Sequence, residues 1–86
     1  MKTIEELKVI QNGKILFSAS FCAPCRGIIA HIGHKNITDI EVFKVDDHIS
    51  EVKEIWGIKT VPTLIVVDNG VQVAKFVGEL EVKQNL

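Results

Sequence analysis

The chain has 86 residues, of which 47% are hydrophobic and 24% charged, and its formal net charge is −1. This length allows one modest core, and the composition is typical of a globular protein rather than a disordered one. A net charge near zero, without a cluster of Lys or Arg, argues against nucleic-acid binding. No apolar run approaches the roughly 18 residues that a membrane-spanning helix needs. We therefore expect residues 1–86 to form a single domain that binds neither nucleic acid nor a membrane.

The first residues, MKTIEEL, place two acidic side chains where a secretory signal would be apolar. We therefore expect a cytoplasmic protein, or a chain from which a targeting segment has already been removed. In a reducing cytosol a permanent disulfide between the two cysteines, Cys22 and Cys25, is not expected. Such a bridge would also close almost no loop, so it would contribute little to stability.

Periodicity and chain breakers predict eight elements. In chain order they are a helix over 3–11, a strand over 14–19, a helix over 22–35, a strand over 39–46, a helix over 50–56, two strands around Asn69-Gly70 and a short helix within 79–86. Thr3 and Glu6 have the spacing of a capping box, and Asn12-Gly13 stops the first helix. Ser50 can cap the third helix, which Gly57 ends.

This order predicts an α/β fold in which helices cover both faces of a mixed sheet. Helices between the first three strands predict parallel crossovers, and the Asn-Gly hairpin adds one antiparallel partner at the end. The LIVV run over 64–67 is apolar at four consecutive positions. We therefore expect its strand to be central, with packing on both faces.

Residues 22–25 read Cys-Ala-Pro-Cys and follow a predicted strand. This arrangement places Cys22 at a helix N-terminus, where unpaired N–H groups and the helix dipole favour a thiolate. Pro24 is tolerated in the first turn and stiffens it. Cys25 lies one turn further in, shielded but within reach of the Cys22 sulfur. We therefore expect Cys22 to attack a partner disulfide and Cys25 to resolve the mixed disulfide.

Four segments together resemble the thioredoxin family in order and spacing: SFCAPCRG, TVPT at 60–63, VDNG at 67–70 and VG at 77–78. The resemblance covers about residues 3–80. It implies a thioredoxin-like fold, with a four-stranded mixed sheet flanked by helices, and a protein-disulfide reductase with a redox-active Cys22–Cys25 disulfide. It also implies a monomer without metal or organic cofactor, which takes electrons from a thioredoxin-reductase-like or other dithiol donor and acts on disulfide-containing proteins.

In that family the proline after the third helix is cis and lies against the active-site cysteines, and this role falls on Pro62. There it would expose the backbone of Val61 to pair with an extended substrate segment. Gly78 would leave room on the opposite wall of the groove. The resemblance thus implies substrate binding by Phe21, Ala23, Pro24, Thr60, Val61, Pro62 and Gly78.

The chain also departs from the family. Phe21 stands where tryptophan is usual, and Ala23-Pro24 replaces Gly-Pro. Leu16 occupies the position of the family's buried aspartate, and Val42 that of its lysine partner. The usual first strand is missing and the last helix is short, so the chain resembles a minimal thioredoxin close to a glutaredoxin in length.

Three other functions remain open. A glutaredoxin-like enzyme would draw on glutathione, for whose carboxylates Lys59 supplies only part of a site. A metal-binding module would recruit His31 and His34, but the resulting C-x2-C-x5-H-x2-H spacing is not a usual zinc pattern. A redox-sensing module would bind a partner without turnover.

Other side chains have simpler interpretations. Trp56 is expected to pack the short third helix on the sheet rather than line a groove. Asp46-Asp47 is typical of a solvated strand end. Arg26 either faces solvent or places its charge near the thiolate, where it would help a partner to dock.

Overall fold

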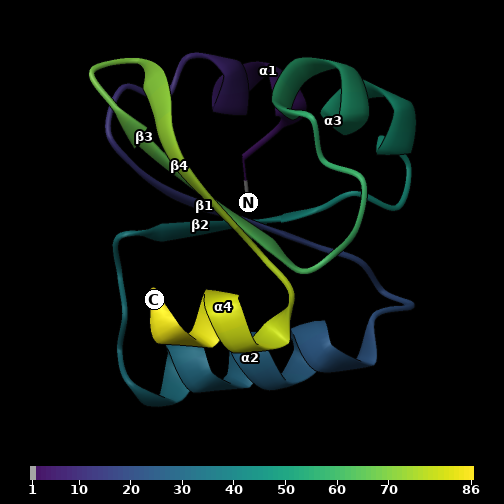
Figure 1. Cartoon of the computed structure of the whole chain (residues 1–86), viewed down its shortest axis with the longest axis vertical. Helices are drawn as coiled ribbons and strands as arrows, with labels where there is room; N and C mark the ends of the chain where they lie inside the picture. Colours follow the sequence, from purple (N-terminus) through teal and green to yellow (C-terminus); the bar gives the residue numbers. More distant parts are fainter. Residues whose placement is uncertain (1) are drawn as a thin grey trace.

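The computed structural model describes residues 2–86. Its elements are Ile4–Lys8 (α1), Gly13–Ser18 (β1), Ala23–His34 (α2), Ile40–Lys44 (β2), Ile49–Trp56 (α3), Thr63–Asp68 (β3), Val71–Val77 (β4) and Glu79–Gln84 (α4). The predicted order of helices and strands is therefore confirmed. Three layers are visible in Figure 1: the sheet lies between α1 and α3 on one face and α2 and α4 on the other.

The four strands form one sheet in the order β2-β1-β3-β4. β1 and β2 are parallel, as predicted, but β3 pairs antiparallel with β1 as well as with β4. The prediction that the first three strands are all parallel is therefore wrong for β3. The reason is the path after α3, where residues 58–62 return to the end of the sheet at which β1 and β2 finish (Figure 1). Because β3 starts at that end, it runs in the opposite direction.

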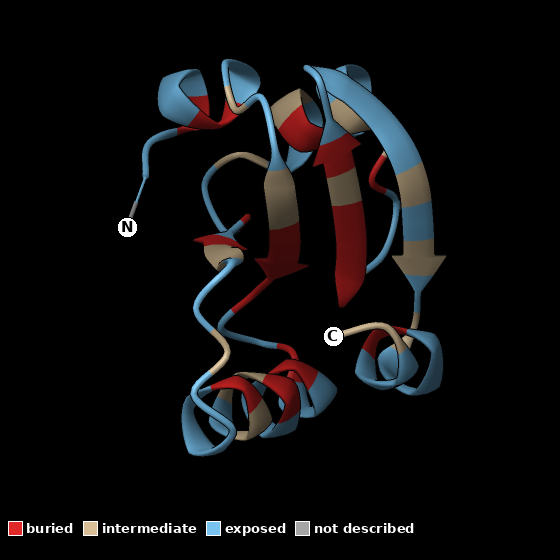
Figure 2. Cartoon of the chain, turned by 90° about the vertical axis from the view of Figure 1, so that its left-hand side faces the viewer, coloured by how far each residue is buried: buried red, intermediate tan, exposed pale blue. Residues whose placement is uncertain are grey.

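The LIVV strand, β3, is interior, with β1 on one side and β4 on the other. Its Leu64 and Ile65 are fully buried and belong to different halves of the core, because successive side chains of a strand point to opposite faces. The half under α1 and α3 includes Ile4, Leu7, Ile15, Phe17, Phe43, Val52 and Ile65. The half against α2 and α4 includes Leu16, Ile28, Ile32, Leu64 and Val82. Figure 2 shows buried residues on the strands and on the helix sides that face them.

The capping box that starts α1 is confirmed. The Glu6 backbone N–H donates to Thr3 Oγ1 at 3.2 Å, and the Thr3 backbone N–H donates to the Glu6 carboxylate at 2.9 Å. The hydrogen bond that the Thr3 backbone N–H donates to the carboxylate lowers the pKa of Glu6, because it favours the charged form. The helix ends at Lys8, earlier than the predicted stop at Asn12-Gly13.

The start of α3 differs from the prediction. Ser50 lies in the first turn, and the N-cap is His48, which makes no side-chain capping hydrogen bond. The helix ends as predicted at Gly57, which has φ +70° in the left-handed region that glycine adopts most readily. Trp56 packs on the sheet, with its ring centroid 5.2 Å from that of Phe17, as expected.

The hairpin between β3 and β4 is also as predicted. Asn69 and Gly70 have φ values of +54° and +78°, the positive angles that a two-residue hairpin turn requires. The Gly70 backbone N–H donates to the Gln11 carbonyl at 2.8 Å, so the turn is tied to the segment after α1.

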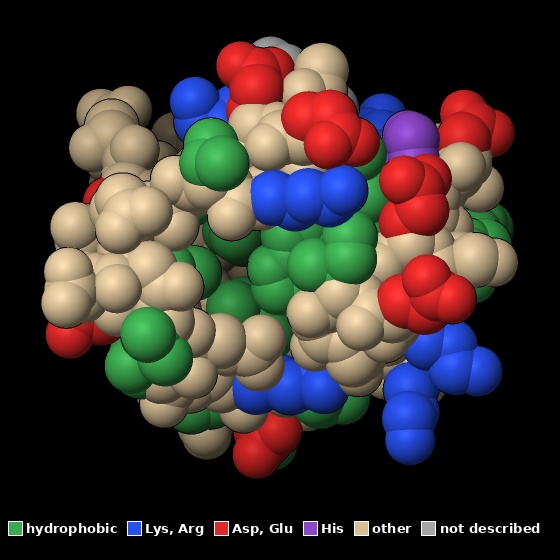
Figure 3. Space-filling model, turned by 90° about the horizontal axis from the view of Figure 1, so that it is seen from above, with side chains coloured by type: hydrophobic (Ala, Val, Ile, Leu, Met, Phe, Trp, Pro, Cys, Tyr) green, Lys and Arg blue, Asp and Glu red, His purple; other side chains and the backbone are tan. Residues whose placement is uncertain are grey.

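The surface over α1 and α3 carries both signs of charge. Lys or Arg side chains alternate with Asp or Glu around a central apolar patch (Figure 3). Such a mixed surface produces no large field of one sign that would attract a polyanion. Within residues 2–86, no helix has the length and apolar character needed to cross a membrane.

Candidate active site at the Cys22–Cys25 pair

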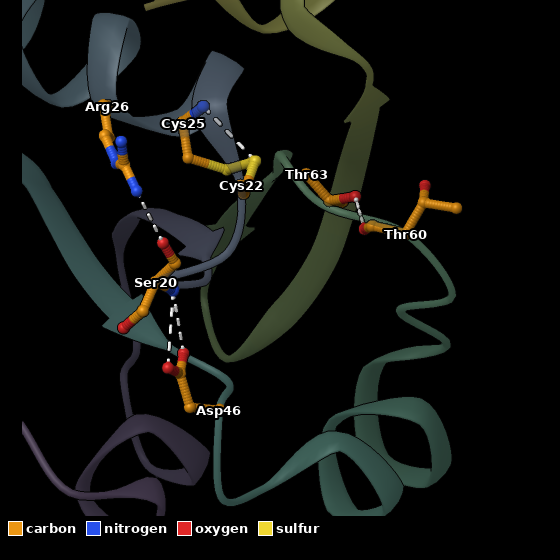
Figure 4. Close-up of a disulfide and its surroundings, with 7 residues drawn as sticks. All are labelled: Ser20, Cys22, Cys25, Arg26, Asp46, Thr60 and Thr63. Carbon is orange, nitrogen blue, oxygen red and sulfur yellow. Dashed lines mark hydrogen bonds between the residues drawn. A yellow bond between two sulfur atoms is a disulfide. The ribbon is translucent and has the colours of Figure 1, made fainter.

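Cys22 and Cys25 form a disulfide at the start of α2, with their Cα atoms 5.3 Å apart (Figure 4). Cys22 is the N-cap of the helix, and its Sγ accepts a hydrogen bond from the Cys25 backbone N–H at 3.3 Å. The Cys22 sulfur thus lies at the positive end of the helix dipole, beside a backbone donor. Both features stabilise a negative charge, so the geometry favours a thiolate at Cys22 when the bond is reduced.

The two sulfur-bearing side chains differ in access to solvent. Cys22 is 7% exposed and Cys25 is 1% exposed. A partner disulfide can therefore approach Cys22 more readily than Cys25. The sequence predicts an accessible attacking Cys22 and a shielded resolving Cys25, and the exposed fractions differ in that order.

The loop before the disulfide is held from both sides (Figure 4). The Ser20 backbone N–H donates to the two Asp46 carboxylate oxygens at 3.1 and 3.4 Å. The Arg26 guanidinium donates to the Ser20 carbonyl at 3.2 Å. The hydrogen bonds from Ser20 lower the pKa of Asp46, because they favour its charged form. Asp46 is exposed, as a solvated strand end should be, but it also fixes this loop.

The segment around Pro62 lies against the other side of the site. The Val61–Pro62 peptide bond is cis. The Thr63 hydroxyl donates to the Thr60 carbonyl at 2.7 Å, and the Gly78 backbone N–H donates to the Pro62 carbonyl at 3.0 Å. Within the described part of the chain, the Val61 backbone N–H and carbonyl have no hydrogen-bond partner. The segment is therefore anchored at its ends while one peptide edge stays available to a partner.

Gly78 follows β4 and has φ +94°, where a larger residue would be strained. A Cβ atom built on it would meet no atom within 4 Å. The space beside Gly78 is therefore open, but the backbone angle is the stronger reason for a glycine at this position.

An apolar groove of about 340 Å³ lies beside the disulfide loop. Its walls include Phe21, Ile49, Ile58, Lys59, Thr60 and Val61. Phe21 is 69% exposed, although it is a large apolar side chain. The sequence predicted Phe21, Thr60 and Val61 as part of this surface and missed Ile49 and Ile58. Ala23 and Pro24 are exposed at the start of α2.

Leu16 lies on the face of the sheet that α2 covers and is fully buried. Its register partner on β2 is Val42, as the predicted correspondence requires. In this half of the core Leu16 packs with the buried apolar residues Ile28, Leu64 and Val82.

The two histidines do not approach the disulfide. His31 and His34 lie in the last turn of α2, whereas Cys22 and Cys25 lie at its beginning. Across residues 2–86, no three His, Cys, Asp or Glu side chains are grouped so that they could hold a metal ion.

The family model described as Thioredoxin matches residues 5–86. The chain belongs to the thioredoxin family. It is 36% identical over 77 residues to Thioredoxin H2-2 of Oryza sativa subsp. japonica, a match that covers 81% of this chain and 58% of that protein. It is 31% identical over 77 residues to Thioredoxin H-type of Fagopyrum esculentum, with 83% and 66% covered. The chain thus spans less than two thirds of the length of these relatives.

Solved thioredoxin structures have the same fold. Oxidised thioredoxin from Plasmodium falciparum superimposes with a TM-score of 0.67 at 30% identity, covering 93% of this chain and 82% of that one. Thioredoxin from Malassezia sympodialis gives a TM-score of 0.75 at 23% identity, covering 98% and 81%. The four-stranded mixed sheet with helices on both faces is therefore a thioredoxin fold.

Proposed function

We propose that this chain is a thiol-disulfide oxidoreductase that reduces protein disulfides through Cys22 and Cys25. The observation that carries the proposal is the Cys22–Cys25 disulfide at the N-terminus of α2 in a member of the thioredoxin family. Residues 1–86 act as one domain in this proposal. Because the dithiol form must be maintained, the protein works in a reducing compartment such as the cytoplasm.

The reaction has two exchange steps. In the first, the Cys22 thiolate attacks one sulfur of the substrate disulfide, and the other substrate sulfur leaves as a thiolate that takes up a proton. In the second, the Cys25 thiolate attacks Cys22 Sγ, which forms the intrachain disulfide and releases the second substrate thiol. Two electrons pass from the dithiol to the substrate. A dithiol donor, such as a thioredoxin-reductase-like protein, then returns them to Cys22 and Cys25.

The surface beside the disulfide supports binding of an extended protein segment. The unpaired backbone of Val61 offers a donor and an acceptor for main-chain hydrogen bonds. The groove walls formed by Phe21, Ile49 and Thr60 can take one side chain of that segment. Pro62 and Gly78, joined by a backbone hydrogen bond, support this edge from behind.

Trapping experiments test the two cysteine roles. Cys25→Ser should accumulate a mixed disulfide with a disulfide-containing protein such as insulin, because Cys22 can still attack and no second cysteine resolves the product. Cys22→Ser should accumulate almost none. Equal trapping by the two variants would contradict the assigned roles. Turnover of insulin with dithiothreitol but not with glutathione separates the proposed enzyme from a glutaredoxin-like one, and no turnover with either reductant would leave only a binding module.

A further inference from the structure

The second exchange step raises a question about a proton. Only the thiolate attacks a disulfide, so the Cys25 thiol must lose its proton before it can displace the substrate. Cys25 is 1% exposed and belongs to the core half under α1 and α3, whose buried members include apolar side chains such as Ala19 and Val45. These side chains accept no proton. The proton therefore needs another path to solvent.

A second cavity, of about 250 Å³, borders Cys25 between the first turns of α2 and the ends of β1 and β2. Ser18 and Ile29 also line it, together with the cationic side chains of Arg26 and Lys44. It shares no lining residue with the apolar groove beside Phe21. The cavity is therefore a separate access to the disulfide, on the side of the resolving cysteine.

The hydroxyl of Ser18 is unusual in this cavity. Ser18 is 1% exposed, and its Oγ is the one buried side-chain polar atom within residues 2–86 that has no hydrogen-bond partner in the protein. A buried hydroxyl without a partner is destabilising, so such a group calls for a specific explanation. It follows three fully buried apolar residues of β1 and lies on the same face as Leu16. A cavity of this size has room for water, and Ser18, Arg26 and Lys44 supply polar groups in its wall.

We propose that Ser18 positions a water molecule that accepts the proton of Cys25 during resolution. The Ser18 hydroxyl hydrogen-bonds to that water, the water takes the proton from Cys25 Sγ, and the proton leaves through the cavity to bulk solvent. The Cys25 thiolate then forms the bond to Cys22 Sγ as the bond from Cys22 to the substrate sulfur breaks. The inference rests on the proposed function, and it makes Ser18 a positioning residue.

The charges around the cavity favour this step. Arg26 on α2 and Lys44 on β2 line it, and their positive charges stabilise the thiolate that the step creates. The nearest carboxylate recorded at this loop, Asp46, accepts two hydrogen bonds from the Ser20 backbone N–H rather than lining the cavity. The local charge therefore favours loss of a proton from Cys25.

The two steps can be timed separately with 5,5′-dithiobis(2-nitrobenzoate). Attack by Cys22 releases one thionitrobenzoate, and resolution by Cys25 releases a second, so stopped-flow absorbance resolves both. We expect Ser18→Ala to leave the first release unchanged and to slow the second by about 100-fold at neutral pH, the lower end of what a positioned base contributes. The slowed rate should recover as the pH rises, because hydroxide then removes the proton directly.

Two controls make the result specific. Ser18→Thr keeps a hydroxyl and should restore most of the second rate. Thr38→Ala removes an exposed hydroxyl that lines neither cavity and should change neither rate. In the unsubstituted protein, the second release should also show a larger solvent deuterium isotope effect than the first, a measurement that needs no variant to fold.

If Ser18→Ala releases the second thionitrobenzoate as fast as the parent at neutral and alkaline pH, the inference is overturned and the proposed function is left intact. Equal isotope effects on the two releases would overturn it as well. Absence of the first release in the unsubstituted protein would instead refute the proposed function.

Discussion

Replacing Leu16 with aspartate tests the half of the core that lies against α2. Leu16 is fully buried, pairs in register with Val42, and packs with Ile28, Leu64 and Val82. Removal of its apolar side chain loses about 1.5–3 kcal/mol of burial. A buried carboxyl without a partner costs a further ~1–3 kcal/mol. We therefore expect Leu16→Asp to lower the free energy of unfolding by about 2.5–6 kcal/mol, a large part of the total for a chain of this size.

The loss should depend on pH in a defined direction. Burial without a partner raises the pKa of the introduced carboxyl above its value in the unfolded chain, which is about 3.9. The neutral acid is tolerated better than the carboxylate, so the deficit is smallest below the unfolded pKa. The stability deficit grows as the pH rises toward and through the folded pKa, because the carboxyl ionises more easily in the unfolded chain than in the folded one. Leu16→Asn introduces a side chain of nearly the same shape as aspartate but without a titrating group, so its loss of stability should not change with pH in this way.

Urea unfolding of the reduced proteins at several pH values measures both effects. An aspartate variant as stable as the parent would show that position 16 is not enclosed in the core against α2. A deficit equal to that of Leu16→Asn at every pH would show that the carboxyl reaches solvent or a cation. Either result would refute the reasoning. We also expect the carboxylate to speed resolution of the mixed disulfide above neutral pH, because it gives the proton of Cys25 a second acceptor.

Three further substitutions test other parts of the structure. Ile49→Asp should raise KM for a disulfide protein substrate by about tenfold through loss of groove contact, whereas Ile55→Asp, exposed on the same helix but outside the groove walls, should not. Asp46→Asn should lower stability at neutral pH. The pKa of Asp46 is held below its ordinary value of 3.8. The stability difference between Asp46→Asn and the parent should therefore vanish as the pH falls through that lowered pKa, which melting temperatures measured across acid pH would show. Gly70→Ala should destabilise the protein by about 1 kcal/mol in urea unfolding, since alanine does not favour a φ of +78°.

Features that depend on a few neighbouring residues could be predicted from the sequence. The capping box of Thr3 and Glu6, the end of α3 at Gly57 and the hairpin at Asn69-Gly70 each rest on local backbone chemistry. The place of Cys22 at the start of α2 follows from the same kind of signal. These features depend on neighbouring residues and not on the later path of the chain, so they can be predicted without tertiary information.

The direction of β3 could not be predicted in this way. A helix between two strands usually returns the chain to the starting end, but α3 is short and ends at Gly57 in the left-handed conformation. Residues 58–62 then bring the chain back to the end at which β1 and β2 finish. The outcome depends on where Ile58 and Pro62 are buried, which is decided by packing against distant segments. The same holds for the groove, whose walls come from the loop before α2, from α3 and from the segment before β3.

The two cavities explain why the disulfide can have different chemistry on its two sides. Phe21, the neighbour of Cys22, lines the apolar groove, where contact with a substrate would be made. Cys25 lines the smaller cavity with Arg26, Lys44 and the unpaired hydroxyl of Ser18. In the proposed function, substrate binding would exclude water from the first region, whereas removal of a proton would need water in the second. Because the two regions share no wall, a bound substrate can cover the side of Cys22 without closing the path by which Cys25 loses its proton.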